Sequence, residues 1–104
     1  MSWFLLILAG LFEVVWAIGL KYSDGFSRFW PSVVTVTALM VSISLLGLAL
    51  KQLPMGTAYG IWVGIGTLGT ALCGILLLGE SVSLLKVASL LFILLGVVGL
   101  KIAS

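Results

Sequence analysis

The sequence predicts an all-α membrane protein with four transmembrane helices in a single domain, residues 1–104. Of these 104 residues, 62% are hydrophobic and only 8% are charged, which is typical of an integral membrane protein. Four apolar stretches cover about residues 3–20, 30–50, 58–78 and 85–102. Because a hydrocarbon core about 30 Å thick requires about 20 helical residues, each stretch is long enough to cross the bilayer once.

Short polar segments separate the four stretches. The first stretch ends at Lys21 and a turn-forming segment with Asp24 and Gly25, and the second ends at Lys51. Such short loops make consecutive helices antiparallel neighbours. We therefore expect an up-down-up-down bundle with both ends of the chain on one side of the membrane.

The third stretch follows Pro54 and is rich in glycine. Backbone polar groups in lipid must be satisfied within the segment, so we expect a helix here as well. Gly64 and Gly66 mark a candidate bend in this helix; alternatively, these glycines only permit close helix packing. In the fourth stretch, Ser89 and Gly96 are small residues one heptad apart, so we expect this helix to form a dimer contact.

The positive charges give almost no preference for one orientation in the membrane. Lys51 and Lys101 lie on the side of the chain ends, whereas Lys21, Arg28 and Lys86 lie on the opposite side. A difference of 3 − 2 = 1 charge is too small for the positive-inside rule to fix the orientation. Either the chain has one orientation that this count does not reveal, or it inserts both ways.

Four short helices also form a thin bundle, with little room for a water-filled cavity sealed from lipid. Many transporters combine two repeats of inverted topology, with the site at their interface. This chain has no internal duplication, so a second copy inserted in the opposite direction would supply the missing repeat. Together with the balanced charges, this predicts an antiparallel, dual-topology homodimer.

Glu13 is the only acidic residue within the four apolar stretches. An ionised carboxylate at bilayer depth costs about 2.5–3.5 kcal/mol even on insertion scales. A binding role is therefore the default expectation for Glu13. The alternative is a structural hydrogen bond to a serine or threonine.

Gly10 and Trp16 lie on the same helix face as Glu13, three residues before and after it. Gly10 leaves space for another helix or a ligand to approach the carboxylate. Trp16 lies deeper than interfacial tryptophans usually do, which favours a role in the wall of a site, where an aromatic face can hold a cation. The alternative for Trp16 is packing against a neighbouring helix.

Three further residues are candidates for the wall of the same site. Ser42 lies near the middle of the second stretch, where its hydroxyl can bond either Glu13 or its own backbone. Tyr59 and Trp62 share one face of the third helix. Tyr59 is near the helix start, where aromatic residues often form an interfacial belt, whereas Trp62 lies about one turn deeper.

The sequence lacks the residues that several kinds of catalytic and metal sites require. The sequence has no histidine and one cysteine, Cys73, which leaves no His-based catalysis, no intrachain disulfide and no cysteine metal cluster. We also find no nucleophile–base pair. We therefore expect no enzyme, no cofactor or metal, and no nucleic-acid partner.

The chemistry of Glu13 suggests an exchange. A carboxylate in a low dielectric binds a proton more readily than in water, and a cation arriving beside it would expel that proton. Proton and cation then compete for one site, which is the chemical requirement for antiport. In a two-fold dimer, two Glu13 carboxylates would lie together and titrate as a coupled pair.

Several segments resemble the small multidrug resistance transporters, and the resemblance covers the whole chain. It rests on Ala9-Gly10 with Glu13-Val-Val-Trp16, on Lys21-Tyr-Ser-Asp-Gly-Phe-Ser-Arg28, on Trp30-Pro31-Ser, and on Pro54-Met-Gly-Thr-Ala-Tyr59-Gly-Ile-Trp62-Val-Gly-Ile-Gly66.

This resemblance implies an antiparallel homodimer in the prokaryotic inner membrane that exchanges protons for a cation by alternating access. Glu13 would be the site shared by proton and substrate. Trp16, Ser42, Tyr59 and Trp62 would line the pocket together with Gly10, with Ser42 and Trp16 bonding or orienting Glu13. Gly64 to Gly66 would be a bend. The family joins its fourth helices through two glycines seven residues apart; here Ser89 replaces the first, and Gly96 is the second.

Within the family, Glu13-Val-Val-Trp16 and Ser42 resemble the subtype that exports guanidinium. Guanidinium is planar, and its forked N–H donors match a carboxylate bidentately. One alternative is a polyspecific exporter of hydrophobic drug cations such as quaternary ammonium ions, which lack N–H groups and favour aromatic faces. Another is a non-transporting structural subunit whose Glu13 pairs with a basic residue of a partner.

Overall fold

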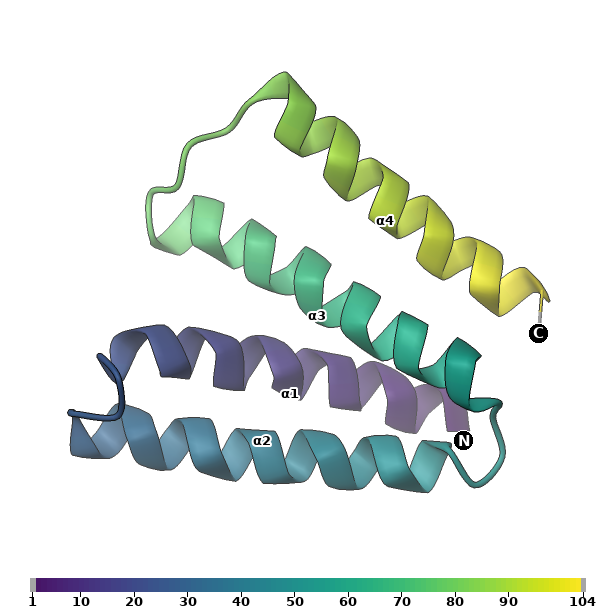
Figure 1. Cartoon of the computed structure of the whole chain (residues 1–104), viewed down its shortest axis with the longest axis horizontal. Helices are drawn as coiled ribbons and strands as arrows, with labels where there is room; N and C mark the ends of the chain where they lie inside the picture. Colours follow the sequence, from purple (N-terminus) through teal and green to yellow (C-terminus); the bar gives the residue numbers. More distant parts are fainter. Residues whose placement is uncertain (1, 104) are drawn as a thin grey trace.

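The computed structural model describes residues 2–103 as four helices joined by short loops (Figure 1). The helices are α1 (Ser2–Tyr22), α2 (Phe29–Ala49), α3 (Met55–Leu77) and α4 (Leu84–Ala103). Each is long and apolar enough to cross a membrane, which confirms the prediction of four transmembrane helices. Every helix begins and ends within three residues of the expected bounds.

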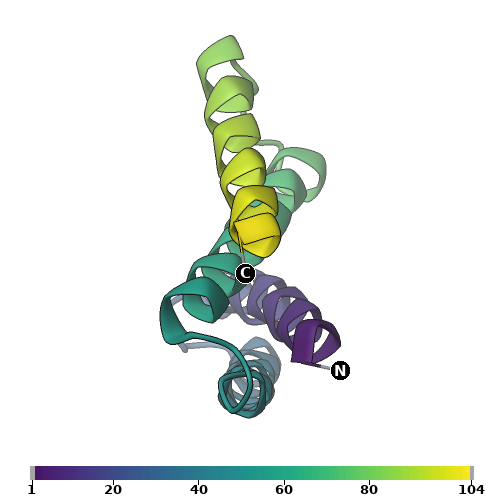
Figure 2. The same ribbon diagram turned by 90° about the vertical axis from the view of Figure 1, so that its right-hand side faces the viewer.

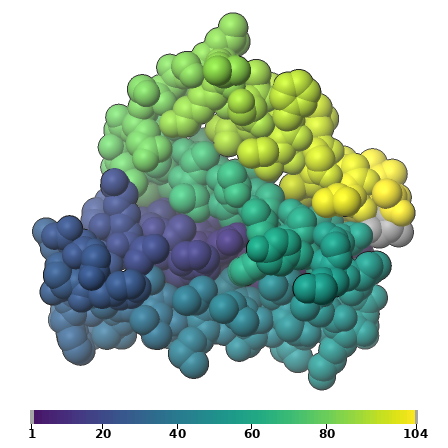
Figure 3. Space-filling view, viewed as in Figure 1, coloured from purple at the N-terminus to yellow at the C-terminus, as the bar shows by residue number. Residues whose placement is uncertain are grey.

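Across the molecule the helices lie in the order α2, α1, α3, α4 (Figure 1), and the start of α3 also comes close to α2 beside α1 (Figure 2). α1 packs between α2 and α3, and the backbone of α4 comes close only to α3. The molecule measures 40 × 35 × 17 Å, so it is thin in one direction. No described residue of α4 is buried, and Figure 3 shows α4 set apart from α1 and α2.

The helices pack most tightly at the end where both chain termini lie, called the closed end below. The buried apolar side chains cluster there: Leu6, Ala9, Leu46, Ala49, Ala58, Ile61 and Trp62. Ser2 donates a hydrogen bond to the side chain of Gln52 in the α2–α3 loop. The Lys101 ammonium lies 5.0 Å from the ring centre of Trp3, which joins the end of α4 to the start of α1.

Toward the opposite end, called the open end below, α3 separates from α1 (Figure 1). The loops of residues 23–28 and 78–83 lie there. In the first loop, the backbone of Asp24 has a positive φ of 49°, which Asp and Asn adopt more readily than most residues. The buried hydroxyl of Ser23 stabilises this turn, because it donates to the Leu20 carbonyl at 2.7 Å and accepts from the Phe26 N–H at 3.1 Å.

Glycines on α3 permit close contacts with both neighbouring helices. A Cβ atom at Gly64 would overlap Val97 of α4, and one at Gly66 would overlap Glu13 of α1. α3 remains an uninterrupted α-helix through both glycines. The structure therefore shows the close packing that the alternative interpretation expected, while a functional bend at Gly64 and Gly66 stays a prediction.

Candidate functional site

A cavity of about 420 Å³ lies between α1 and α3 on the open-end side of Glu13. Its walls combine the second half of α1 with the second half of α3 and the start of the following loop. The lining residues are Glu13, Trp16, Ala17, Ile18, Lys21, Gly66, Thr67, Thr70, Ala71, Gly74, Leu78 and Glu80.

The carboxyl group of Glu13 packs directly against the backbone of α3. A Cβ atom at Gly66 would coincide with this carboxyl group, so glycine is required for the contact. Oxygen Oε1 of Glu13 is fully buried and has no hydrogen-bond partner among residues 2–103. Because buried polar atoms are normally paired, this oxygen lacks the partner that its burial calls for.

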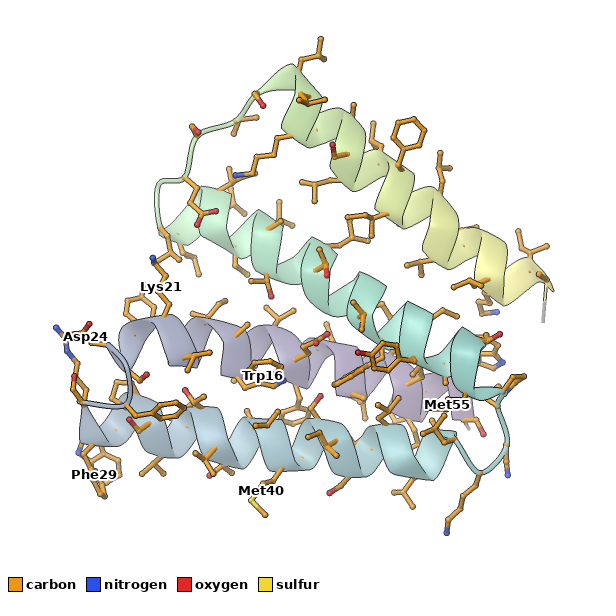
Figure 4. All side chains as sticks on the ribbon, viewed as in Figure 1. Trp16, Lys21, Asp24, Phe29, Met40 and Met55 are labelled. Atoms are coloured by element: carbon orange, nitrogen blue, oxygen red, sulfur yellow. The ribbon has the colours of Figure 1, made fainter. Side chains whose placement is uncertain are left out.

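Trp16 lines the same cavity and also carries an unpaired polar atom. Its indole Nε1 is buried without a hydrogen-bond partner in the described part of the chain. The bond expected from Trp16 to Glu13 is therefore not present in this structure. Trp16 extends from the second half of α1 (Figure 4) and lines the cavity one helical turn beyond Glu13.

Ser42 and Trp62 bind the backbone of α1 rather than Glu13. The Ser42 hydroxyl donates to the Ala9 carbonyl at 2.6 Å. The Trp62 indole N–H donates to the Ser42 oxygen at 3.0 Å and to the same Ala9 carbonyl at 3.3 Å. The hydrogen bond expected between Ser42 and Glu13 is thus absent, because the single hydroxyl proton of Ser42 goes to Ala9.

This network nevertheless acts on the turn that carries Glu13. Ala9 precedes Glu13 by four residues, so its carbonyl also accepts the backbone N–H of Glu13 in a regular α-helix. Ser42 and Trp62 are both buried, and their bonds hold α1, α2 and α3 together at this point. They hold α1 in place on the closed-end side of Glu13, and neither residue lines the cavity.

The remaining predicted wall residues also lie on the closed-end side of Glu13. A Cβ atom at Gly10 would overlap Ile65, so Gly10 serves the contact between α1 and α3. Tyr59 is 53% exposed, and its ring centre lies 5.6 Å from that of Trp62. Within one protomer, Gly10 and Tyr59 therefore do not reach the cavity.

The predicted dimer residues of α4 face away from the rest of the protomer. Ser89 and Gly96 are both exposed. A Cβ atom at Gly96 would meet no atom within 4 Å. Both positions are therefore accessible to a second chain.

Sequence reasoning missed the part of the cavity nearest the membrane surface, which Lys21, Thr70, Gly74 and Glu80 line. One available signal was the spacing of Gly66, Thr70 and Gly74, which are four residues apart and share one helix face. Glu80 gave no such signal, because it lies beyond the end of α3, where charged residues are common.

Four helices that are long and apolar enough to cross a membrane make this chain a multi-pass membrane protein. More particularly, the chain belongs to the Small Multidrug Resistance protein family, whose model matches residues 1–93. This confirms the family resemblance of its motifs. As predicted, it is a multi-pass protein of the inner membrane.

The chain is also similar over its whole length to individual family members. Proteins named guanidinium exporter are 59% identical to it in Escherichia coli strain K12 and in Yersinia pestis, and 57% identical in Salmonella typhimurium strain LT2. Each match covers 100% of this chain and 99–100% of the relative. These names are those of transporters, which fits the expectation that the chain is not an enzyme.

The network around Ala9 leads to a prediction about stability. Ser42→Ala removes the hydroxyl that both accepts from Trp62 and donates to Ala9, so the free energy of unfolding should fall by about 1–2 kcal/mol. The measurement is unfolding of the purified protein in detergent micelles by titration with sodium dodecyl sulfate. Ser44→Ala is the matched control, because the exposed Ser44 hydroxyl bonds only Met40 of its own helix. Equal losses in the two variants would show that the network does not hold the helices together.

Proposed function

We propose that this protein exports guanidinium and small substituted guanidinium ions in exchange for protons, by alternating access in an antiparallel homodimer. The observation that carries this proposal is the buried, unpaired oxygen of Glu13 in a cavity at bilayer depth. The names of the relatives, at 57–59% identity over the full chain, support guanidinium as the substrate.

The chemistry of the cavity suits a donor-rich planar cation. The Glu13 carboxylate can accept two parallel N–H bonds from a guanidinium ion. A quaternary ammonium ion has no N–H group and would leave oxygen Oε1 unpaired. The cavity volume of about 420 Å³ also exceeds what an unsubstituted guanidinium ion needs, which leaves room for small substituents.

Exchange follows from the use of one carboxylate by two ligands. A proton on Glu13 removes the charge that attracts the cation, and a bound cation occupies the oxygen that would take the proton. Either ligand neutralises the buried charge, whereas the empty ionised site is costly in a low dielectric. The empty site therefore resists moving through the membrane, and this links export to proton entry.

The shape of the protomer supports alternating access in a dimer. Its core packs at the closed end, whereas the cavity of Glu13 lies toward the open end. A second copy inserted upside-down would present its open end to the other side of the membrane. A protomer only 17 Å thick cannot surround a substrate, so the second copy would also supply the missing wall, and the exposed Tyr59 is available to it.

A cross-linking experiment tests the antiparallel arrangement. Ser89 and Gly96 lie on either side of the middle of α4, about 10 Å apart along the axis. In an antiparallel pair, Ser89 of one copy lies at the depth of Gly96 of the other. We expect Ser89→Cys and Gly96→Cys, carried on separate copies in a Cys73→Ala background, to cross-link to each other in membranes. A parallel dimer would instead link each cysteine to its own counterpart, and this result would contradict the proposal.

The exchange mechanism is tested by transport into proteoliposomes with an acidic interior. We expect wild-type protein to accumulate guanidinium, and Glu13→Gln to reduce this uptake at least about 100-fold, because it removes the charge and the exchangeable proton. Asp24→Asn is the control, since it removes the same charge from an exposed loop.

Two results would contradict the proposed function. Proton-driven uptake that persists in Glu13→Gln would show that Glu13 is not the shared site. A wild-type protein that prefers tetraalkylammonium ions to guanidinium would be an exporter of drug cations instead.

A further inference from the structure

A second carboxylate, that of Glu80, lines the same cavity as Glu13. Glu80 lies in the loop that follows α3, at the mouth of the cavity near the membrane surface. On the opposite wall, Lys21 extends from the end of α1 toward the end of α3 (Figure 4). The exchange described at Glu13 makes no use of Glu80.

Two glycines place the carboxylates at opposite ends of one face of α3. A Cβ atom at Gly66 would overlap the carboxyl group of Glu13, and one at Gly74 would overlap that of Glu80. These glycines are eight residues apart, which is about 12 Å along a helix axis. Thr70 lies midway between them on the same face and lines the cavity. The cavity is therefore a path along two turns of α3 with an acid at each end.

The position of Glu80 is fixed by α3, although its side chain remains accessible to water. The backbone N–H of Glu80 donates to the Gly74 carbonyl at 3.1 Å, and its carboxyl group packs against the same glycine. The side chain is nevertheless 45% exposed. A cation arriving from water therefore reaches Glu80 before it reaches the buried oxygen of Glu13.

The ion pair of Glu80 is too loose to occupy its carboxylate fully. Nζ of Lys86 lies 3.6 Å from Oε1 of Glu80, which is longer than a hydrogen bond. Such partly exposed pairs contribute little. The Lys86 ammonium also donates to the Ser81 carbonyl at 3.1 Å, so it retains a partner when another cation takes its place beside Glu80.

We propose that Glu80 forms an outer binding site for the guanidinium-type cation at the mouth of the Glu13 cavity. This proposal rests on the proposed function. The carboxylate offers the same bidentate acceptor as Glu13, and it offsets the charges of Lys21 and Lys86, which alone would repel a cation from the mouth. The cation moves between Glu80 and Glu13 along the face that carries Thr70.

Glu80→Gln tests this assignment, because it keeps the shape of the side chain and removes its charge. In proteoliposomes at about 20 mM salt, we expect KM for guanidinium to rise about 5- to 10-fold, while kcat stays within about two-fold of wild type. At about 300 mM salt the difference should shrink, since salt screens exposed charges. Lys86→Gln should change KM in the opposite direction.

Asp24→Asn is the matched control. It removes one negative charge from the same side of the membrane but lies outside the cavity, and asparagine tolerates the positive φ at this position. Its KM should stay within about two-fold of wild type. An equal rise in both variants would show a general surface-charge effect and overturn the outer site.

Other outcomes distinguish a failure of the outer site at Glu80 from a failure of the function proposed for Glu13. An unchanged KM in Glu80→Gln, or a fall in kcat alone, would overturn the outer site and leave the function of Glu13 intact. If Glu80→Gln does not fold, Lys86→Gln decides, and an unchanged KM there contradicts the proposal. Failure of the wild-type protein to transport guanidinium would overturn the proposed function and the outer site together.

Discussion

The Glu13 carboxyl group packs against the backbone of α3 at Gly66, and this contact marks the inner end of the cavity. It places an ionisable group at bilayer depth with one oxygen unpaired, which is costly unless a proton or a cation binds. The bonds of Ser42 and Trp62 to the Ala9 carbonyl fix the helix on one side of this contact. The cavity leaves the other side accessible.

The four helices pack more tightly at the closed end than at the open end. The cavity therefore lies toward the open end. Apolar side chains, the Ser2–Gln52 bond and the Lys101–Trp3 contact hold the closed end together. Toward the open end, α3 still contacts α1 at Gly66, which packs against Glu13, and at Gly69, which packs against Val14. Because no described residue of α4 is buried, this helix leaves a large apolar area for lipid or for a second copy.

The sequence predicted the helices and the central acid, because both depend on properties of single residues or stretches. Apolar length determines where a helix can span, and a lone carboxylate in such a stretch stands out. The partner of Ser42 could not be predicted, because a small rotation of a helix decides whether its hydroxyl meets Glu13 or Ala9. Glu80 was also missed, because its approach to the cavity depends on how the loop folds back onto Gly74.

Proton release on cation binding tests most directly whether both ligands share Glu13. Guanidinium is added to the purified protein in a weakly buffered detergent solution, and binding and pH are recorded together. If both ligands share Glu13, binding is saturable and releases protons in proportion to the bound cation, the apparent affinity weakens at lower pH, and Glu13→Gln releases none. Saturable binding to the wild-type protein without proton release at any pH between about 5 and 8 would contradict a shared site.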